Sequence, residues 1–160
     1  MLIKVIAVGT KMPTWVDQVS QDYSQRLPAD IKLEWHEVKA EKRSDKKISV
    51  DEAERYMSKE AERIREALPK EAHLVALDEQ GLAVDSVQLS QHLQRWRENA
   101  KPVVILIGGP DGLHAPLKAA CMQKISLSKL TLPHPLVRIV LAEQLYRAWS
   151  ILTNHPYHRI

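Results

Sequence analysis

The sequence predicts one α/β domain, built from a mainly parallel sheet with helices on both of its faces. Short apolar runs alternate with segments of helical periodicity, which is the pattern of layered α/β proteins. The run from Val103 to Ile107 is apolar at every position, as expected of a strand covered on both faces. A chain of 160 residues, 44% of them hydrophobic, buries a core without disulfides or metal ions. We therefore assign residues 1–160 to one domain.

The first third of the chain predicts a strand, a helix and a second strand. Leu2 to Val8 is a mostly apolar, β-branched run typical of a buried strand. A helix that ends before Pro28 should follow, because apolar residues recur at every fourth position: Trp15, Val19, Tyr23 and Leu27. Apolar and polar residues then alternate from Ile31 to Val38, which predicts a strand with one solvated face.

The next segment combines a charged loop with a helix. Lys39 to Lys47 has five basic residues and no periodicity, so we predict a mobile loop. Ser49 and Glu52 have the spacing of a capping box, and the helix that they start should extend to Pro69. We interpret this helix as a packing element.

His73 to Asp78 predicts a third strand, and Glu79 to Asp85 predicts a turn-rich loop around Gly81. Ser86 is the expected N-cap of a helix that continues through Trp96.

The last third predicts a short helix, a fifth strand and a long apolar helix. The short helix should begin at Pro116 and the strand should cover Ile125 to Leu130. The final helix should begin at Pro135, which suits a first helical turn. Its polar stripe is so narrow that it must be buried on more than one side, which indicates a subunit interface.

Charge and composition exclude several protein classes. The net charge is +3, but residues 1–100 hold 16 basic and 18 acidic side chains, whereas residues 101–160 hold 7 and 2. This asymmetry favours a phosphate-bearing partner near the C-terminal end, the alternative being an ordinary basic surface. The single cysteine, Cys121, has no partner in the chain, and there is no signal-peptide pattern, so we expect a cytoplasmic protein. No apolar run approaches the roughly 20 residues that span a bilayer, which argues against a membrane protein.

Three loops follow predicted strand ends, where ligands bind in open α/β sheets. These loops are Asp78 to Gly81, Gly108 to Leu113 and Thr131 to His134. The second contains three glycines in the string GGPDG, which allow a ligand to approach the backbone closely. It matches neither of the standard phosphate-binding patterns, so it is either a ligand loop or a tight strand-to-helix turn.

The segment SLSKLTLPHP is stiffened by Pro133 and Pro135 at a helix start. Backbone groups held there without regular partners can hydrogen-bond the edge of an adenine; the alternative is a rigid linker. His134, near the positive end of the helix, should resist protonation and is either a general base or an ordinary capping residue.

The C-terminal string NHPYHR gathers aromatic and basic side chains. Tyr157 is suited to stacking on a base and Arg159 to binding phosphate. His155 and His158 lack the further ligands of a zinc site, so we expect no metal.

Three strings together resemble one family. AVGTKMPTWV, LIGGPDGL and SLSKLTLPHPLVRIVLAEQLYRAWSILTNHPYHR are similar to the SPOUT-class ribosomal RNA large-subunit methyltransferase H family. These enzymes methylate N3 of a pseudouridine in large-subunit rRNA. The likeness covers nearly the whole chain and is weakest between Lys39 and Lys70.

The resemblance implies a homodimer, S-adenosylmethionine as methyl donor, and a C-terminal trefoil knot in the SPOUT α/β fold. It implies the assembled ribosome as substrate and no contact with a membrane. The donor site transferred to matching positions comprises Leu77, Gly108, Gly109, Ser128, Lys129, Leu130, Thr131, Leu132 and Pro133. These positions lie in the three loops that follow the predicted strands or directly beside them.

For the transfer itself, we hypothesise that His158 or Tyr157 orients or deprotonates the base. Arg159 and Arg147 would bind RNA phosphate or offset charge, although Arg147 has the spacing to pair instead with Glu143. Two other functions fit the same residues: a ribosome-binding factor without catalysis, and a SPOUT methyltransferase acting on tRNA or on a ribose oxygen.

Overall fold

Five strands form one sheet in the order β2-β1-β4-β3-β5, and every neighbouring pair is parallel. The computed structural model describes residues 1–44 and 46–159. The strands are β1 (Leu2–Val8), β2 (Lys32–Val38), β3 (His73–Ala83), β4 (Val103–Ile107) and β5 (Gln123–Ser126). The predicted α/β class with a parallel sheet is confirmed.

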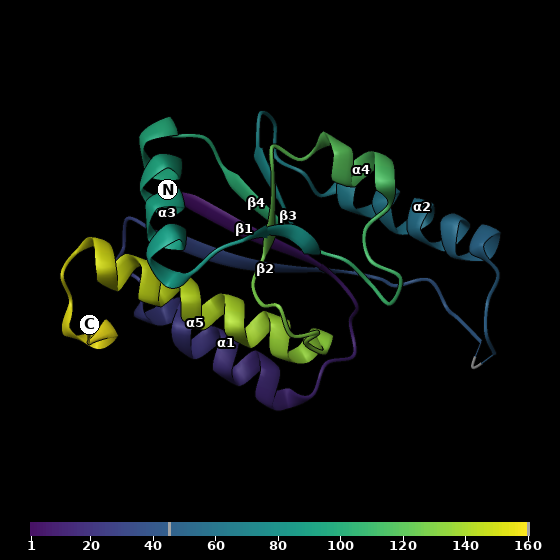
Figure 1. Cartoon of the computed structure of the whole chain (residues 1–160), viewed down its shortest axis with the longest axis horizontal. Coiled ribbons are helices and arrows are strands. Elements are labelled where there is room, and N and C mark those ends of the chain that lie inside the picture. The colour runs from purple at the N-terminus through teal and green to yellow at the C-terminus, as the bar shows by residue number, and fades with distance from the viewer. Residues whose placement is uncertain (45, 160) are drawn as a thin grey trace.

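Helices cover both faces of this sheet (Figure 1). On one face lie α1 (Thr14–Arg26), α3 (Ser86–Asn99) and α5 (His134–Leu152), and on the other lie α2 (Val50–Glu66) and α4 (Ala115–Ala120). A 3-10 turn, η1 (Pro156–His158), follows α5. No helix among the described residues is long and apolar enough to cross a membrane.

The position of β4 at the centre of the sheet explains why all of its residues are apolar. All five of its residues are buried. Ile105 packs into the apolar cluster under α1, α3 and α5, whereas Leu106 packs into the cluster under α2 and α4. Because successive side chains point to opposite faces, a strand between two helical layers needs apolar residues throughout.

The third strand is longer than the sequence predicted. Residues 79–83 continue β3 instead of forming a loop, with a register shift against β5 between Leu77 and Leu82. Gly81 permits this, because a Cβ there would lie 2.7 Å from the carbonyl carbon of Lys124 in β5. The glycine therefore marks a close approach of two strands, not a turn.

Two other boundaries also differ. Asp85, not Ser86, caps α3, and it forms a capping box in which its carboxylate accepts from the Gln88 N–H at 2.7 Å. β5 ends at Ser126, four residues earlier than predicted, because the Ser126 hydroxyl donates to the Ser128 carbonyl and turns the chain out of the sheet. Ser49 caps α2 as expected.

The predicted apolar stripe of α1 is confirmed at its end, where Leu27 is buried and Tyr23 packs against the core, but not at its start. Val16 and Ser20 are the buried positions, whereas Trp15 is 48% exposed. Apolar residues at every fourth position indicate the period of the helix, but they do not determine which face meets the sheet.

The connection after β2 is tied to the rest of the protein, contrary to the predicted mobile loop. Arg43 forms ion pairs with Glu60 and Asp111, and Glu41 pairs with Arg63. α2 is therefore more than the packing element that we predicted, because it supplies the buried partner Glu60. Position 45 of this connection lies outside the described residues.

Candidate functional site

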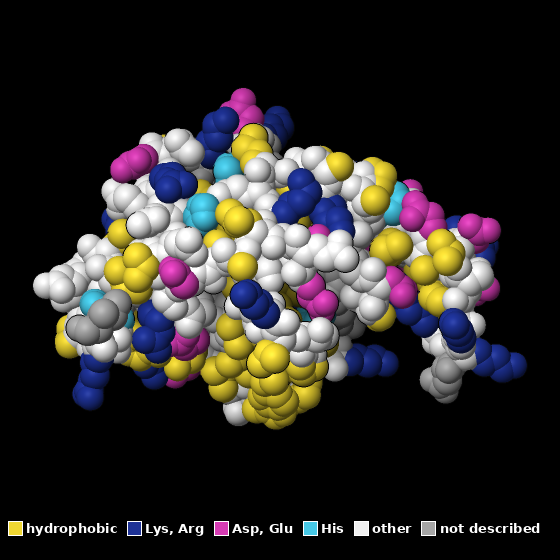
Figure 2. Space-filling view, in the orientation of Figure 1, with side chains coloured by type: hydrophobic (Ala, Val, Ile, Leu, Met, Phe, Trp, Pro, Cys, Tyr) yellow, Lys and Arg dark blue, Asp and Glu magenta, His cyan; other side chains and the backbone are white. Residues whose placement is uncertain are grey.

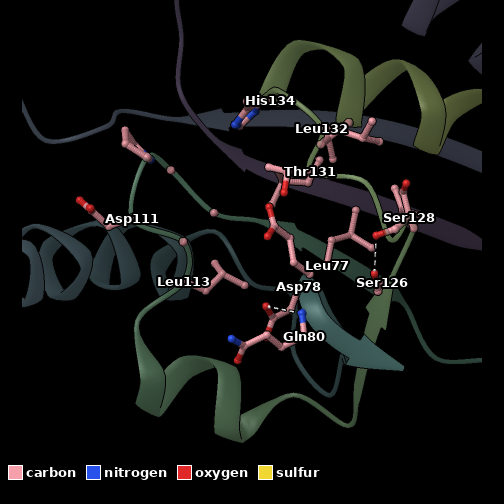
Figure 3. A pocket seen from close by; sticks show the side chains of 18 of the residues that line it. Leu77, Asp78, Gln80, Asp111, Leu113, Ser126, Ser128, Thr131, Leu132 and His134 are labelled. Carbon is pink, nitrogen blue, oxygen red and sulfur yellow. Dashed lines mark hydrogen bonds between the residues drawn. The ribbon is translucent and has the colours of Figure 1, made fainter. Parts of the chain in front are cut away.

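A cavity of about 650 Å³ opens at the carboxyl edge of the sheet. In Figure 3 its walls come from the ends of β3, β4 and β5, the connections after β4 and β5, and the start of α5. Parallel strands deliver all these segments to one edge, as the sequence predicted. The size is that of a pocket for a small organic ligand.

The wall after β4 is a tight glycine turn. The Gly112 N–H donates to the Gly109 carbonyl at 3.0 Å, which closes a β-turn with Pro110 at its second position. A Cβ on Gly108 would lie 2.5 Å from the Gly112 carbonyl carbon, and one on Gly109 would lie 2.9 Å from Val8 Cγ1. Side chains are therefore excluded at both positions, and the turn presents backbone to the pocket.

The wall after β5 presents unpaired backbone groups. Within the described residues, the peptide N–H and C=O groups of Thr131 and Leu132 have no hydrogen-bond partner. On either side the chain is fixed, because the Ser128 hydroxyl accepts from the Leu130 N–H and the Pro133 carbonyl accepts from Leu136 and Val137. This wall can pair with the polar edge of a planar heterocycle.

His134 lies on the same wall as a neutral ring. Its Nε2 accepts from Arg138 Nε at 2.9 Å. Burial, together with the charge of Arg138, lowers the pKa of His134 to about 4, although a hydrogen bond to the Gly108 backbone acts in the opposite direction. The predicted resistance to protonation is thus present, with burial as its main cause. Because Nε2 is occupied by a buried cation, the ring is not free to serve as a general base.

Opposite charges meet in the lining of the cavity. Lys118 on α4 lies 3.0 Å from Asp78 on β3. Burial acts to raise the pKa of Asp78, but hydrogen bonds from Lys118 and from the Gln80 N–H outweigh it and lower the pKa. The pocket therefore keeps an ionised carboxylate at neutral pH.

Ion pairs that were not predicted from the sequence brace the pocket from outside. Arg138 donates to Glu37 at 2.6 Å and to the Gly9 carbonyl at 2.9 Å, so it fixes the start of α5 to the ends of β1 and β2. Arg43 binds both Glu60 oxygens and also Asp111 of the glycine turn. A charged residue within the apolar run of the last helix, Arg138, was the available signal.

Most of the predicted cofactor residues are brought together by the structure. Seven line the cavity: Leu77, Gly108, Gly109, Ser128, Leu130, Thr131 and Leu132. Lys129 and Pro133 are adjacent in the chain, but they are not among the lining residues.

The predicted catalytic residues lie elsewhere in the chain. The Tyr157 hydroxyl donates to Glu143, which stands nine residues after His134 and roughly 14 Å further along the helix. His158 bonds the Ser150 hydroxyl at 2.7 Å, another seven residues on. Arg159 is exposed just beyond η1. None of these residues lines the cavity.

Arg147 and Tyr157 share one carboxylate. Arg147 Nη2 lies 2.6 Å from Glu143 Oε1, so the predicted alternative pairing is the one observed. The hydrogen bond to Glu143 is the main reason why the pKa of Arg147 is raised. Burial, with the neighbouring Tyr23 and Glu143, raises the pKa of Tyr157, which therefore stays protonated.

No group of three or more His, Cys, Asp or Glu within residues 1–44 and 46–159 is placed to bind a metal ion.

The chain is similar to known proteins over nearly its whole length. A family model described as "Predicted SPOUT methyltransferase" matches residues 1–158. Proteins named ribosomal RNA large subunit methyltransferase H from Bordetella avium (strain 197N) and Bordetella pertussis (strain Tohama I) are 54% and 53% identical over 159 residues. One from Nitrosomonas eutropha is 46% identical. Each match covers 99% of both chains.

Two solved structures share the fold at low sequence identity. One is a probable methylase family protein from Haemophilus influenzae, with a TM-score of 0.55 and 9% identity over 96% of this chain and 69% of that one. The other, described as "Structural insights into the 2-OH methylation of C/U34 on tRNA", has a TM-score of 0.53 and 17% identity, and the match covers 96% and 97%.

Proposed function

Because the chain belongs to the SPOUT methyltransferase family, we propose that it transfers a methyl group from S-adenosylmethionine to large-subunit rRNA. The acceptor that we propose is N3 of a pseudouridine in the assembled ribosome, which makes the cytoplasm the place of action. Relatives at 46–54% identity over 99% of the chain carry the name of that activity.

The observation that carries the proposal is the backbone-walled cavity. Two independent routes, the strand ends and the family resemblance, lead to the same cavity, and they share four of its lining residues: Gly108, Gly109, Thr131 and Leu132. Side chains would block the glycine turn, and the peptide groups of Thr131 and Leu132 have no partner among the described residues. Such a cavity suits an adenosyl group, whose base is neutral and planar.

S-adenosylmethionine supplies an already activated methyl group on a sulfonium. The protein therefore has to bind both reactants in line and exclude water, so positioning is its main contribution. In our proposal the Thr131 and Leu132 backbone binds the adenine edge, and the turn from Gly108 to Gly112 surrounds the remainder of the donor. Ionised Asp78 provides a hydrogen-bond acceptor for a hydroxyl or ammonium group.

A homodimer would bring the tail to this pocket. Figure 2 shows a dense apolar patch over the beginnings of α1 and α5, where Trp15 and Leu136 are 48% and 41% exposed. A patch of this kind marks an interaction site. Since Tyr157 and His158 lie away from the pocket of their own chain, we propose that each pocket receives the tail of a second copy.

In that arrangement the tail has distinct roles. Tyr157 stays protonated, so it orients the base as a donor, and His158 remains the candidate proton acceptor for N3. Arg147 and Arg159 would bind phosphate or offset charge on the base. The trefoil knot implied by the resemblance stays a prediction.

Transfer of labelled methyl from S-adenosylmethionine tests the function. We expect incorporation into intact ribosomes and little into free subunits or naked RNA. Mass spectrometry of rRNA and tRNA from a deletion strain, with and without complementation, should show one methylated pseudouridine lost and restored. Loss of a tRNA or ribose methyl would contradict the proposal, and failure to bind the donor in calorimetry would indicate a non-catalytic factor.

Truncation after Asn154 tests the tail. The shortened protein should bind S-adenosylmethionine nearly as the full chain does, yet transfer no methyl group. Mixing a pocket variant, Gly109→Val, with His158→Ala should restore about a quarter of the wild-type activity, because mixed dimers have one complete site. Normal turnover by the truncated protein would remove the tail from the mechanism.

A further inference from the structure

Exposed lysines follow three of the five strands at the edge that contains the pocket. Lys11 follows β1, Lys39 and Lys42 follow β2, and Lys129 follows β5. All four side chains are exposed. Because the strands are parallel, the four positions lie at the same carboxyl edge as the cavity, and Lys and Arg side chains surround the centre of the face in Figure 2.

These lysines carry surplus charge. Four carboxylates at this edge already have a cation within 4 Å: Glu37 with Arg138, Glu41 with Arg63 and Lys59, Asp78 with Lys118, and Asp111 with Arg43. None of the four lysines is in an ion pair with any residue that the structure describes. Glu79 and Asp17 are exposed carboxylates without an ion pair among the described residues, and Asp17 lies with Glu37 and Arg138 around a second, smaller cavity. The pocket therefore sits in a positive local field despite the modest net charge of +3.

The position of two of these lysines is fixed by a buried ion pair. Glu60 is 2% exposed and accepts from the Glu41 N–H at 2.9 Å and from Arg43 at 2.8 Å. Arg43 in turn donates to Asp111 of the glycine turn at 2.8 Å. Removing two charges from water is costly, and such pairs are weak evidence for stability. Their effect here is to fix the stretch from Lys39 to Lys42 beside the donor turn.

We propose that Lys11, Lys39, Lys42 and Lys129, which we call the lysine rim, bind phosphates of the rRNA around the target nucleoside. The inference rests on the proposed function and adds the surface that holds the substrate. A lysine is a point charge on a flexible stem, so it suits backbone phosphates whose geometry is set by the ribosome. Contacts of this kind position the RNA without selecting a sequence.

The test compares two pairs of substitutions with the same loss of charge. Lys39→Ala with Lys42→Ala removes half of the rim. Lys70→Ala with Lys101→Ala is the control, because these exposed lysines precede β3 and β4 and so lie at the opposite edge of the sheet. Co-sedimentation with purified ribosomes is measured between 50 and 200 mM salt, and donor binding is measured by calorimetry.

We expect the rim variant to bind ribosomes about tenfold more weakly at low salt, with a logarithmic salt dependence shallower by about 2, one unit for each lost phosphate contact. Donor affinity should be unchanged, and the control pair should match the wild type. Lys39→Arg with Lys42→Arg, which keeps both charges, should restore ribosome binding.

The proposed role of the lysine rim would be contradicted if the Lys39→Ala, Lys42→Ala variant kept the wild-type ribosome affinity and salt dependence. It would also be contradicted if the control pair lost as much ribosome affinity as the rim variant. These readouts are separate from the proposed function, which fails if the wild-type protein transfers no methyl group to the ribosomes that it binds.

Discussion

At the scale of single residues, buried charges decide the geometry of the pocket. Arg138 and Arg43 each bind a carboxylate from a distant part of the chain, and each also contacts a wall of the cavity. Neither arginine lines the pocket itself. Substituting either arginine therefore removes support of the site without removing a group that would contact the donor.

The pH dependence of stability should reveal His134. The folded ring has a pKa of about 4 against 6.5 for the free side chain, so between these values the unfolded chain binds more protons. Stability is therefore fully present above about pH 6.5 and falls as the pH drops toward 4, by on the order of 2 kcal/mol after allowing for partial exposure. Chemical denaturation at pH 7 and pH 4.5 should show this extra loss in the wild type and not in His134→Gln. Equal pH dependence of the two proteins would contradict it.

Substitution of Arg43 should lower the free energy of unfolding by more than is usual for a loop residue. Arg43→Ala leaves Glu60 buried without a cation, which should lower the free energy of unfolding by about 3 kcal/mol. Adding Glu60→Gln should recover part of that loss, because the unpaired charge is gone. Arg26→Ala, which breaks an exposed pair with Asp22, is the matched control and should have no measurable effect. A double variant less stable than Arg43→Ala would show that the pair is not the cause.

At the scale of elements, the ends of strands and helices position the site, and their causes are local but specific. β3 continues through the residues predicted as a loop because Gly81 allows close contact with β5. β5 stops early because the Ser126 hydroxyl bonds the Ser128 carbonyl, which releases the next residues to form a wall. A single hydrogen bond or a missing side chain thus moved each boundary.

The cap of α3 offers a direct test at this scale. Asp85→Ala removes the acceptor for the Gln88 N–H and should lower the free energy of unfolding by about 1 kcal/mol. Asp85→Asn, which keeps an oxygen at the same place, should be nearly neutral. Thermal denaturation of the two variants measures the difference. A destabilisation of Asp85→Asn equal to that of Asp85→Ala would mean that the carboxylate acts by its charge and not as the cap.

At the scale of the whole molecule, the distance between pocket and tail requires a second chain for the proposed reaction. The helix α5 separates His134 from His158, and its first turns carry the apolar patch. Dimerisation through that patch would be a condition for activity and not only for stability.

Leu136→Glu tests this condition. A buried, unpaired carboxylate on the patch should yield a monomer in sedimentation velocity and abolish methyl transfer, while the donor still binds. Val50→Glu, at a position 86% exposed on α2 across the sheet, is the control and should sediment as the wild-type protein does. A monomeric and active Leu136→Glu variant would refute the shared site.

Local patterns in the sequence were enough to place β1, β2 and β4, the buried centre of the sheet, the glycine turn and the unpaired segment before the last helix, but not the ends of β3 and β5. Periodicity and backbone sterics act over a few residues, so they can be deduced without a fold. The pairs Arg43 with Asp111 and Arg138 with Glu37 join residues 68 and 101 positions apart, and the order β2-β1-β4-β3-β5 alone makes them neighbours. The same packing, and not any motif, placed the tail along α5 instead of beside the pocket in its own chain.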